Sequence, residues 1–182
     1  FNRNEITALY GDLDENGNEL DDIPNRRFIG EAQDVIWGKE VVGVYQLGEE
    51  AEAAAFGVFP GDFKILDVNG DGALTTEDNT FQGYSKPRFN WAMTNNFTFL
   101  KNFDLAIEIY SSIGQKRSFN NAKNRNGFID RTNSFQTPYW TTENPLTDYA
   151  RLFSSDGNAG FNVYRNSSFV RLNNITLGYN LP

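Results

Sequence analysis

The sequence predicts an all-β protein built from antiparallel strands. Aromatic residues make up 15% of the 182 residues, with 16 Phe and 8 Tyr, whereas the hydrophobic content is only 39% and the mean hydropathy is −0.54. Many aromatic side chains among few aliphatic ones are typical of strands with one apolar and one polar face. Residues 88–100 and 103–110 show this directly, because apolar and polar side chains alternate along both with period two.

Residues 88–100 form the clearest predicted strand. One face, interrupted only by Asn95, carries Phe89, Trp91, Met93, Phe97 and Phe99. Lys101 and Asn102 predict a tight turn into a return strand, whose apolar face carries Phe103, Leu105, Ile107 and Ile109. A last strand is predicted over residues 169–181, where Ile175, Leu177 and Tyr179 alternate with polar residues and glycine.

The remaining elements are predicted to be short. They comprise, in chain order, a strand over 1–10, a polar turn over 11–22, a strand broken by bends over 28–44, a helix over 49–56 ended by Gly57, and a strand over 63–66. Residues 118–158 differ, because they form a long polar stretch studded with aromatic side chains. Connections of this length are usually functional or mobile, so we expect a binding or contact loop here.

The composition excludes several classes of function. The net charge of −8 and the pI near 4.6 leave no basic surface for nucleic acid. The chain contains neither Cys nor His, so disulfides, thiolate metal sites, a histidine base and a Ser-His-Asp triad are all excluded within it. Its 24 acidic residues form no recognisable catalytic motif, and no apolar run is long enough for a membrane helix. The sequence therefore predicts no enzyme.

Residues 67–78 fit the pattern of an EF-hand-type calcium loop. Oxygen ligands are expected at positions 1, 3, 5, 7, 9 and 12 of the loop, from Asp67, Asn69, Asp71, the Ala73 carbonyl, Thr75 and Asp78. Gly72 at position 6 permits the sharp turn that the loop needs. The alternative is an Asx-rich turn that binds nothing, since Asp, Asn and Gly favour turns in any case. Residues 12–23 echo the pattern without a closing oxygen, which predicts only a turn.

Two architectures remain open for the strands. The alternation by itself favours a soluble β-sandwich, whose apolar faces would form a buried core. A sandwich, however, needs several more regular strands, and these are not evident in the sequence. The alternative is a transmembrane β-barrel, whose strands need only about ten residues of alternating polarity.

Four motifs resemble one family in residue content and in order along the chain. They are Pro60-Gly61-Asp62 in its alanine-rich context, the acidic loop from Asp67 to Gly72, the stretch Tyr139-Trp140-Thr141-Thr142-Glu143-Asn144-Pro145 followed by Tyr149 and Arg151, and the strand over residues 168–179. Together they resemble the C-terminal part of SusC/RagA-like TonB-dependent outer-membrane transporters. The resemblance covers most of the chain.

The resemblance implies that residues 1–182 are a fragment of a large antiparallel transmembrane β-barrel of about 22 strands. It implies long extracellular loops, with 118–158 as one of them, a calcium-type loop at 67–78, and a plug domain outside this segment. The protein would lie in the Gram-negative outer membrane, contact lipid, and import glycans, oligosaccharides or peptides with TonB and a SusD-like surface lipoprotein. The alternative is a secreted, calcium-stabilised carbohydrate-binding or adhesion module.

The residues that would bind the transported substrate are not identified by the sequence. Four aromatic residues of the long loop, Phe135, Tyr139, Trp140 and Phe153, could stack on sugar rings or pack on the lipoprotein partner. They could equally pack within the loop itself, and the sequence leaves both possibilities open.

Overall fold

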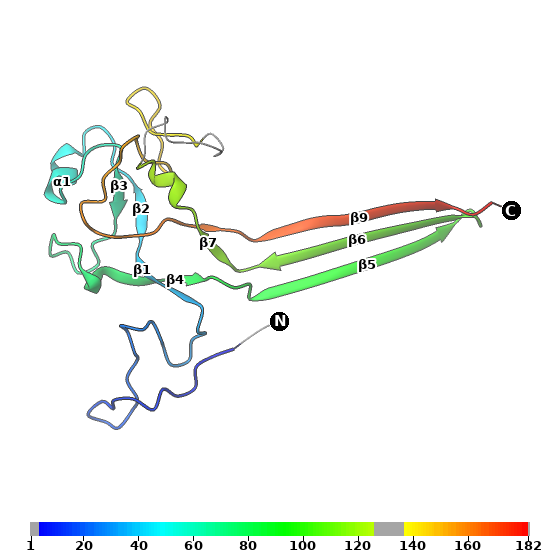
Figure 1. Cartoon of the computed structure of the whole chain (residues 1–182), viewed down its shortest axis with the longest axis horizontal. Helices are drawn as coiled ribbons and strands as arrows, with labels where there is room; N and C mark the ends of the chain where they lie inside the picture. Colours follow the sequence, from blue (N-terminus) through cyan, green and yellow to red (C-terminus); the bar gives the residue numbers. More distant parts are fainter. Residues whose placement is uncertain (1–3, 126–136, 182) are drawn as a thin grey trace. The chain divides into compact units, whose positions relative to one another are not determined.

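The computed structural model describes residues 4–125 and 137–181, and it is rich in strands with very little helix (Figure 1). The strands are β1 Val35–Lys39, β2 Val41–Val44, β3 Phe63–Ile65, β4 Asn79–Tyr84, β5 Phe89–Phe99, β6 Phe103–Ile113, β7 Lys116–Ser118, β8 Tyr164–Asn166 and β9 Phe169–Tyr179. The helical elements are α1 Glu50–Ala55 and two 3-10 turns, η1 Thr76–Asp78 and η2 Asn120–Lys123. None of the helices in the described ranges is long or apolar enough to cross a membrane.

The chain divides into two compact units. The first, which we call the sheet unit, comprises Phe1–Val35, Gly83–Arg117 and Asn166–Pro182. The second, the loop unit, comprises Ile36–Gln82 and Ser118–Arg165. Each unit is therefore built from segments that are distant in sequence.

Three long strands form the sheet of the sheet unit, in the order β5-β6-β9, with both pairings antiparallel (Figure 1). Each strand has 11 residues. The register between β5 and β6 is regular from Phe89 opposite Ile113 to Phe99 opposite Phe103. The turn that joins these strands is tight, because Leu100 and Lys101 both adopt positive φ angles of 50° and 68°. The predicted hairpin and its apolar and polar faces are confirmed.

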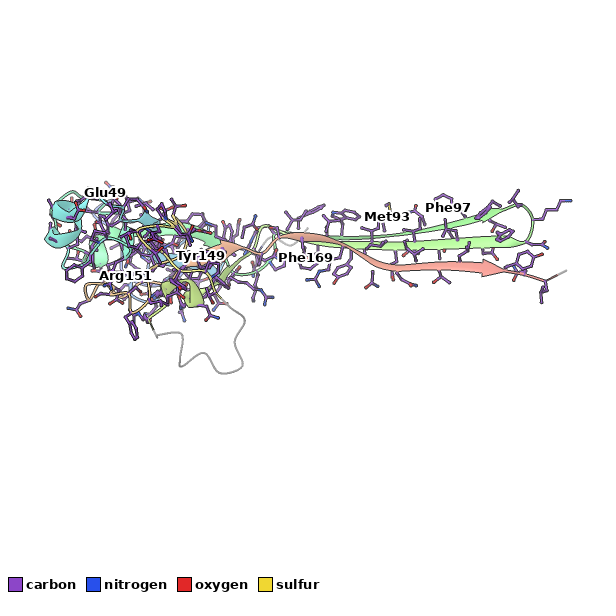
Figure 2. All side chains as sticks on the ribbon, turned by 90° about the horizontal axis from the view of Figure 1, so that it is seen from above. Glu49, Met93, Phe97, Tyr149, Arg151 and Phe169 are labelled. Carbon is purple, nitrogen blue, oxygen red and sulfur yellow. The ribbon has the colours of Figure 1, made fainter. Side chains whose placement is uncertain are left out.

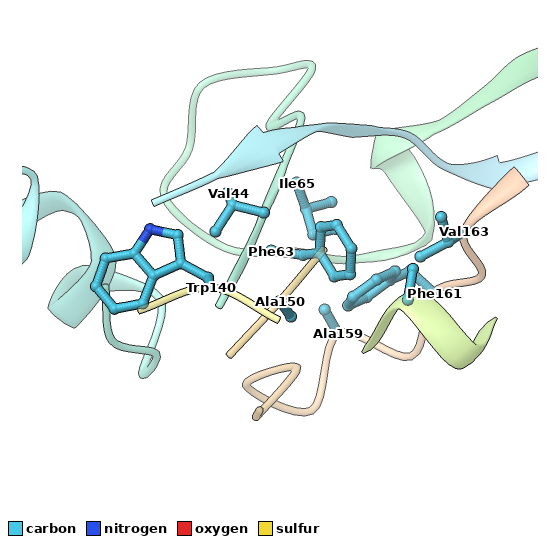
Figure 3. Close-up of a cluster of buried hydrophobic side chains, with 9 residues drawn as sticks. Val44, Phe63, Ile65, Trp140, Ala150, Ala159, Phe161 and Val163 are labelled. Atoms are coloured by element: carbon cyan, nitrogen blue, oxygen red, sulfur yellow. The ribbon is translucent and has the colours of Figure 1, made fainter. Parts of the chain in front are cut away.

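The loop unit has its own hydrophobic core, and irregular segments contribute much of it (Figure 3). Val44, Phe63 and Ile65 come from the antiparallel pair β2-β3. They pack against residues from the second half of the unit, namely Ala122, Trp140, Ala150, Ala159, Phe161 and Val163. Phe63 and Phe161 meet edge to face with ring centroids 5.9 Å apart. The long polar stretch is thus a packed structure over its described residues, although no helix or strand lies between 137 and 163.

The short elements were predicted with mixed success. The helix and the strand after Pro60 are confirmed as α1 and β3, and the broken strand over 28–44 is confirmed as β1 and β2 with a break at Glu40. The strand over 1–10 is wrong in its described part, where Ile6 makes one isolated bridge to Ile29. In place of a strand partner, the Glu19 carboxylate accepts the Leu9 N–H at 2.7 Å. Strands β4, β7 and β8 were not predicted.

Candidate functional site

One face of the β5-β6-β9 sheet is apolar across all three strands. Ten of its large apolar side chains are exposed by between 38% and 63%: Phe89, Met93, Phe97, Phe99, Ile113, Val170, Leu172, Ile175, Leu177 and Tyr179. Figure 2 shows Met93 and Phe97 projecting from the same side of the sheet. Trp91, Leu105, Ile107 and Ile109 lie among them, and Asn95 and Ser111 are the polar exceptions. A continuous exposed patch of this kind marks a surface for a membrane or another protein.

Aromatic rings gather at the turn end of this apolar face. The Phe99 and Phe103 rings stack at 5.5 Å, and the Phe103 and Tyr179 rings lie 4.8 Å apart. Phe89 and Trp91 stand at the opposite end of β5, with Met93 between the two groups. Aromatic residues at both ends of an aliphatic band are characteristic of strands that cross a membrane.

The opposite face of the sheet is polar and internally hydrogen-bonded. Asp104 accepts hydrogen bonds from the Thr98 hydroxyl and the Asn180 amide, both at 2.8 Å. Glu108 accepts one from the Asn173 amide at 2.7 Å. Nearer the start of β9, the Arg171 guanidinium lies 4.4 Å from the centroid of the Phe169 ring. This face therefore suits water or polar ligands.

A β-bulge in β9 keeps the apolar side chains of this strand on one face of the sheet and its polar side chains on the other. The register of β6 with β9 shifts between Glu108 and Ile109, which face Asn174 and Leu172, so Asn173 is the extra residue. Without the bulge, the period of two that places Ile175 on the apolar face would also place Asn173 and Arg171 there. With it, Val170 and Leu172 continue the apolar face. The bulge was not predicted, although the apolar alternation changes phase between Leu172 and Ile175 in the sequence.

Deleting Asn173 should change the stability of the sheet by no more than about 1 kcal/mol, because the ladder becomes regular and every apolar residue keeps its face. Deleting Thr176 is the matched control. It should cost roughly 2–3 kcal/mol, because it turns Ile175 towards the polar face and Asn174 towards the apolar face. Urea unfolding of the two variants in lipid vesicles measures the difference. Equal losses in both would contradict the role given to the bulge.

Pro60-Gly61-Asp62 forms a buried contact between two segments of the loop unit. The Asp62 side chain is fully buried and accepts the N–H groups of Phe59 at 3.0 Å and Ser155 at 3.1 Å. It also pairs with the Arg151 guanidinium, with Nε 2.9 Å from Oδ1. Asp62 thus joins two segments almost ninety residues apart in sequence.

Gly61 is required at this point by close packing. Its φ angle is 90°, and a Cβ atom there would lie 2.5 Å from Trp140 Cε3 and 2.9 Å from Arg151 Cβ. The Arg151 N–H also donates to the Gly61 carbonyl at 2.7 Å. Three residues of the family motifs, Gly61, Trp140 and Arg151, therefore meet in one contact. This contact could not be predicted from the sequence, because no local pattern shows which distant segments pack together.

The four aromatic residues of the long loop have different surroundings. Trp140 is buried and its indole N–H donates to the Gln46 side chain at 2.9 Å, so it packs within the loop unit. Tyr139 and Phe153 are exposed. Phe135 lies outside the described residues. Of the three that the structure describes, Tyr139 and Phe153 are thus exposed to a ligand or a partner, and Trp140 is not.

The carboxylates of the acidic loop accept hydrogen bonds from backbone N–H groups of the same loop. The two Asp67 carboxylate oxygens accept the N–H groups of Gly70 and Gly72 at 2.8 and 2.9 Å, and the Asp71 carboxylate accepts that of Ala73 at 2.8 Å. Gly72 has a φ angle of 78°, so the sharp turn expected there is present, and Gly70 is also left-handed, with a φ angle of 73°. Asn69 donates to the carboxylates of Asp71 and Glu77, and Thr75 begins the 3-10 turn as its cap.

Asp78, the expected closing ligand, is buried and accepts the N–H groups of Val68 at 2.9 Å and Thr75 at 2.7 Å. Burial raises the pKa of this carboxyl, but backbone hydrogen bonds from Thr75, Val68 and Asn69, together with the charge of Lys39, outweigh burial and leave the pKa below its ordinary value. Among residues 4–125 and 137–181, no three Asp or Glu side chains converge as a metal site. In this structure the carboxylates of Asp67, Asp71 and Asp78 are all engaged with backbone N–H groups.

No protein-family model matches the chain. Two curated proteins of Formosa agariphila, each named a TonB-dependent receptor, are 29% identical to it, one over 157 residues that cover 84% of the chain and the other over 193 aligned residues that cover all of it. Over most or all of its length the chain is thus similar to TonB-dependent receptors. The exposed apolar face agrees with this similarity, because TonB-dependent receptors are proteins of the Gram-negative outer membrane. As a family, these receptors are transporters and not enzymes, which agrees with the lack of a recognisable catalytic motif in the sequence.

The chain spans only 16% and 19% of the length of these two receptors. The all-β character predicted for this segment is confirmed, whereas no closed barrel is formed by the strands that the structure describes.

Proposed function

We propose that the β5-β6-β9 sheet is part of the wall of an outer-membrane transport barrel, with its apolar face against lipid and its polar face towards the lumen. The observation that carries this proposal is the apolar face, which is exposed and continuous over three strands. Strands of 11 residues extend about 37 Å, which at a tilt near 45° spans roughly 26 Å, the height of the apolar band of such barrels. A secreted carbohydrate-binding module would leave the same apolar face in water, which disfavours that alternative.

The connectivity of the sheet supports an orientation. Outer-membrane barrels have short turns on the periplasmic side and long loops outside the cell. The tight turn at Leu100 and Lys101 would accordingly be periplasmic. The segment between β6 and β9, which includes residues 118–158, leaves the sheet at the other end and would be extracellular.

The transported material and the partners follow from the resemblance to SusC/RagA-like transporters. We propose import of glycans, oligosaccharides or peptides, driven through TonB and assisted by a SusD-like surface lipoprotein. The polar face with Asp104, Glu108 and Arg171 supports polar cargo. Loss of growth on one such nutrient after deletion of the gene, together with co-purification of a surface lipoprotein, would test this assignment.

Cysteine labelling tests the orientation of the faces, because the chain contains no Cys of its own. An environment-sensitive fluorophore at Leu177→Cys should be quenched by brominated lipid. The same fluorophore at the neighbouring Thr176→Cys, on the polar face, should not be quenched. Equal quenching at both positions, or quenching only at position 176, would refute the proposed lipid contact.

We further propose that residues 67–78 bind calcium as a structural ion, through the side chains of Asp67, Asn69, Asp71, Thr75 and Asp78 and the carbonyl of Ala73. Two observations support this ligand set. Gly70 and Gly72 are left-handed, and their N–H groups hold the Asp67 carboxylate in place. The ion would offset repulsion among carboxylates close in sequence. Its effect would be to hold the loop that precedes β4.

Calcium at 100 times its Kd should stabilise the loop unit by about 2.7 kcal/mol, and the double variant Asp67→Ala, Asp71→Ala should lose this gain. The matched control is Asp12→Ala, Asp14→Ala in the other Asx-rich turn. There the Asp14 side chain accepts the N–H groups of Asn16 and Asn18, and position 12 of the pattern has no oxygen ligand. Hydrogen exchange of the loop unit with calcium and with chelator provides the measurement. If the parent protein gained no protection from calcium, the site would be only a turn.

A further inference from the structure

A pocket of about 410 Å³ lies in the loop unit, on one short stretch of the chain. Its lining consists of Thr137, Pro138, Tyr139, Thr141 and Asn144. Trp140, in the middle of this stretch, does not line the pocket, because its indole packs in the hydrophobic core of the loop unit (Figure 3). The volume falls within the range of small-molecule sites, about 300–1,000 Å³. The pocket is therefore large enough for a small ligand such as one sugar ring.

Hydrogen bonds anchor this stretch to the rest of the loop unit. The Trp140 backbone N–H donates to the Ala150 carbonyl at 3.2 Å, and the Trp140 indole N–H donates to the Gln46 side chain at 2.9 Å. The Asn124 side chain donates to the Pro138 and Ala150 carbonyls, both at 2.8 Å. A site that is held in shape before binding loses less conformational entropy when its ligand arrives.

A tight turn places Asn144 beside Thr141. The backbone N–H of each residue donates to the carbonyl of the other, at 3.1 and 3.2 Å. The Asn144 N–H also lies 3.0 Å from the Thr141 hydroxyl oxygen, which accepts it. Tyr139 lines the same pocket and is 38% exposed. The turn thus brings an amide and a hydroxyl to the pocket that the Tyr139 ring lines.

Three polar side chains of the pocket are uncharged and available to a ligand. Within residues 4–125 and 137–181, no side chain that lines the pocket carries a charge. The Tyr139 hydroxyl and the Asn144 amide make no hydrogen bond to these described residues, and the Thr141 hydroxyl only accepts one. Hydroxyls both donate and accept, and an amide carries donor and acceptor side by side. The pocket thus offers uncharged hydrogen-bonding groups beside an exposed aromatic ring.

We propose that this pocket binds one ring of a neutral saccharide, with a C–H face of the sugar on Tyr139 and sugar hydroxyls bonded to Asn144 and Thr141. The inference rests on the proposed import function and narrows its substrate class to neutral glycans. A sugar ring combines an apolar face with hydroxyls that donate and accept, which matches an aromatic ring beside an amide and a hydroxyl. In the proposed orientation this stretch lies outside the cell, where a nutrient first meets the receptor.

The absence of charge in the described lining separates this ligand from its competitors. A short peptide brings a charged amine and a charged carboxylate at its ends. An acidic sugar brings a carboxylate or a sulfate. Removing such a charge from water without a counter-charge is costly, and no described residue of the lining supplies one. The uncharged sugar ring therefore fits the pocket best.

Binding measurements on the full-length receptor in detergent micelles test the proposal. The probes are short neutral oligosaccharides of glucose, galactose, mannose or xylose, with short peptides as the competing class. At least one saccharide should bind the parent receptor, and Tyr139→Ala should weaken that binding by about 10-fold or more, because the stacking ring is lost. Tyr139→Phe keeps the ring and should stay within about threefold of the parent. Asn144→Ala should also weaken binding, because it removes hydrogen bonds to the sugar hydroxyls.

Phe153→Ala is the matched control, because Phe153 is also an exposed aromatic residue of the loop unit and does not line the pocket. This variant should bind the saccharide as the parent does. Four results would each overturn the proposal: no effect of Tyr139→Ala, an equal loss in Phe153→Ala, binding of peptides in place of saccharides, or no binding of any saccharide probe.

Growth of cells that express the receptor separates the pocket from the proposed import. A receptor that supports growth on a saccharide, with an affinity that Tyr139→Ala leaves unchanged, would keep the import function and lose the pocket. A receptor that binds a saccharide through Tyr139 but supports no growth on it would keep the pocket and lose the import function. Recovery of each variant in the outer-membrane fraction, measured on the same cells, shows that the variants are compared at equal amounts.

Discussion

Replacing Asp62 with Ala is expected to lower the stability of the loop unit by about 3–5 kcal/mol, the cost of removing one partner from a buried ion pair. The side chain is fully buried and carries the Arg151 guanidinium and two backbone N–H groups. Alanine would leave all of these donors without their acceptor, and water has little access to replace it. The Trp140 segment, which packs on Gly61 beside this pair, should loosen with it.

Asp148→Ala is the matched control for this prediction. Asp148 also pairs with an arginine, Arg165, but its side chain is 61% exposed and the pair is 3.5 Å apart. Its removal should cost no more than about 1 kcal/mol, as is usual for exposed ion pairs. Hydrogen exchange over residues 36–82 and 137–165 measures both variants. Similar protection in the two would show that Asp62 does not hold the unit together.

Replacing Ile175 with Arg is expected to destabilise the membrane-inserted receptor by about 2–4 kcal/mol, the cost of a charge on the lipid face near the bilayer midplane. Ile175 lies at the middle of β9, opposite Ile107, and is more than half exposed on the apolar face. In lipid no water would solvate the guanidinium unless the side chain reached the interface. The effect therefore depends on the proposed orientation of the sheet.

Thr176→Arg provides the comparison one residue away. Thr176 faces Ala106 on the polar side, so a charge there would meet lumen water and change stability by about 0.5 kcal/mol or less. Urea titration of receptor folded into vesicles separates the two variants. A larger loss at position 176 than at position 175 would reverse the assignment of the faces and with it the proposed barrel wall.

The hairpin and its two faces could be predicted from residue order alone. Alternation is a local property, because side chains two residues apart share a face wherever the strand lies. Residues 88–100 and 103–110 therefore predicted β5, β6 and their apolar face, and the absence of Cys and His excluded whole classes of chemistry. The spacing of residues 67–78 likewise predicted a sharp turn at Gly72, and the left-handed φ angle of this residue is found.

The tertiary structure alone decided features that depend on distant partners. The extra residue at Asn173 becomes a bulge only because β6 fixes the register of β9. Trp140 belongs to a core, and Asp62 to a buried ion pair, because segments about ninety residues apart come together in the loop unit. Long-range packing of this kind leaves no periodic signal, since each segment contributes one or two side chains without repeating. A polar stretch such as 118–158 thus resembles a loose loop in sequence, yet its described residues help to build a core.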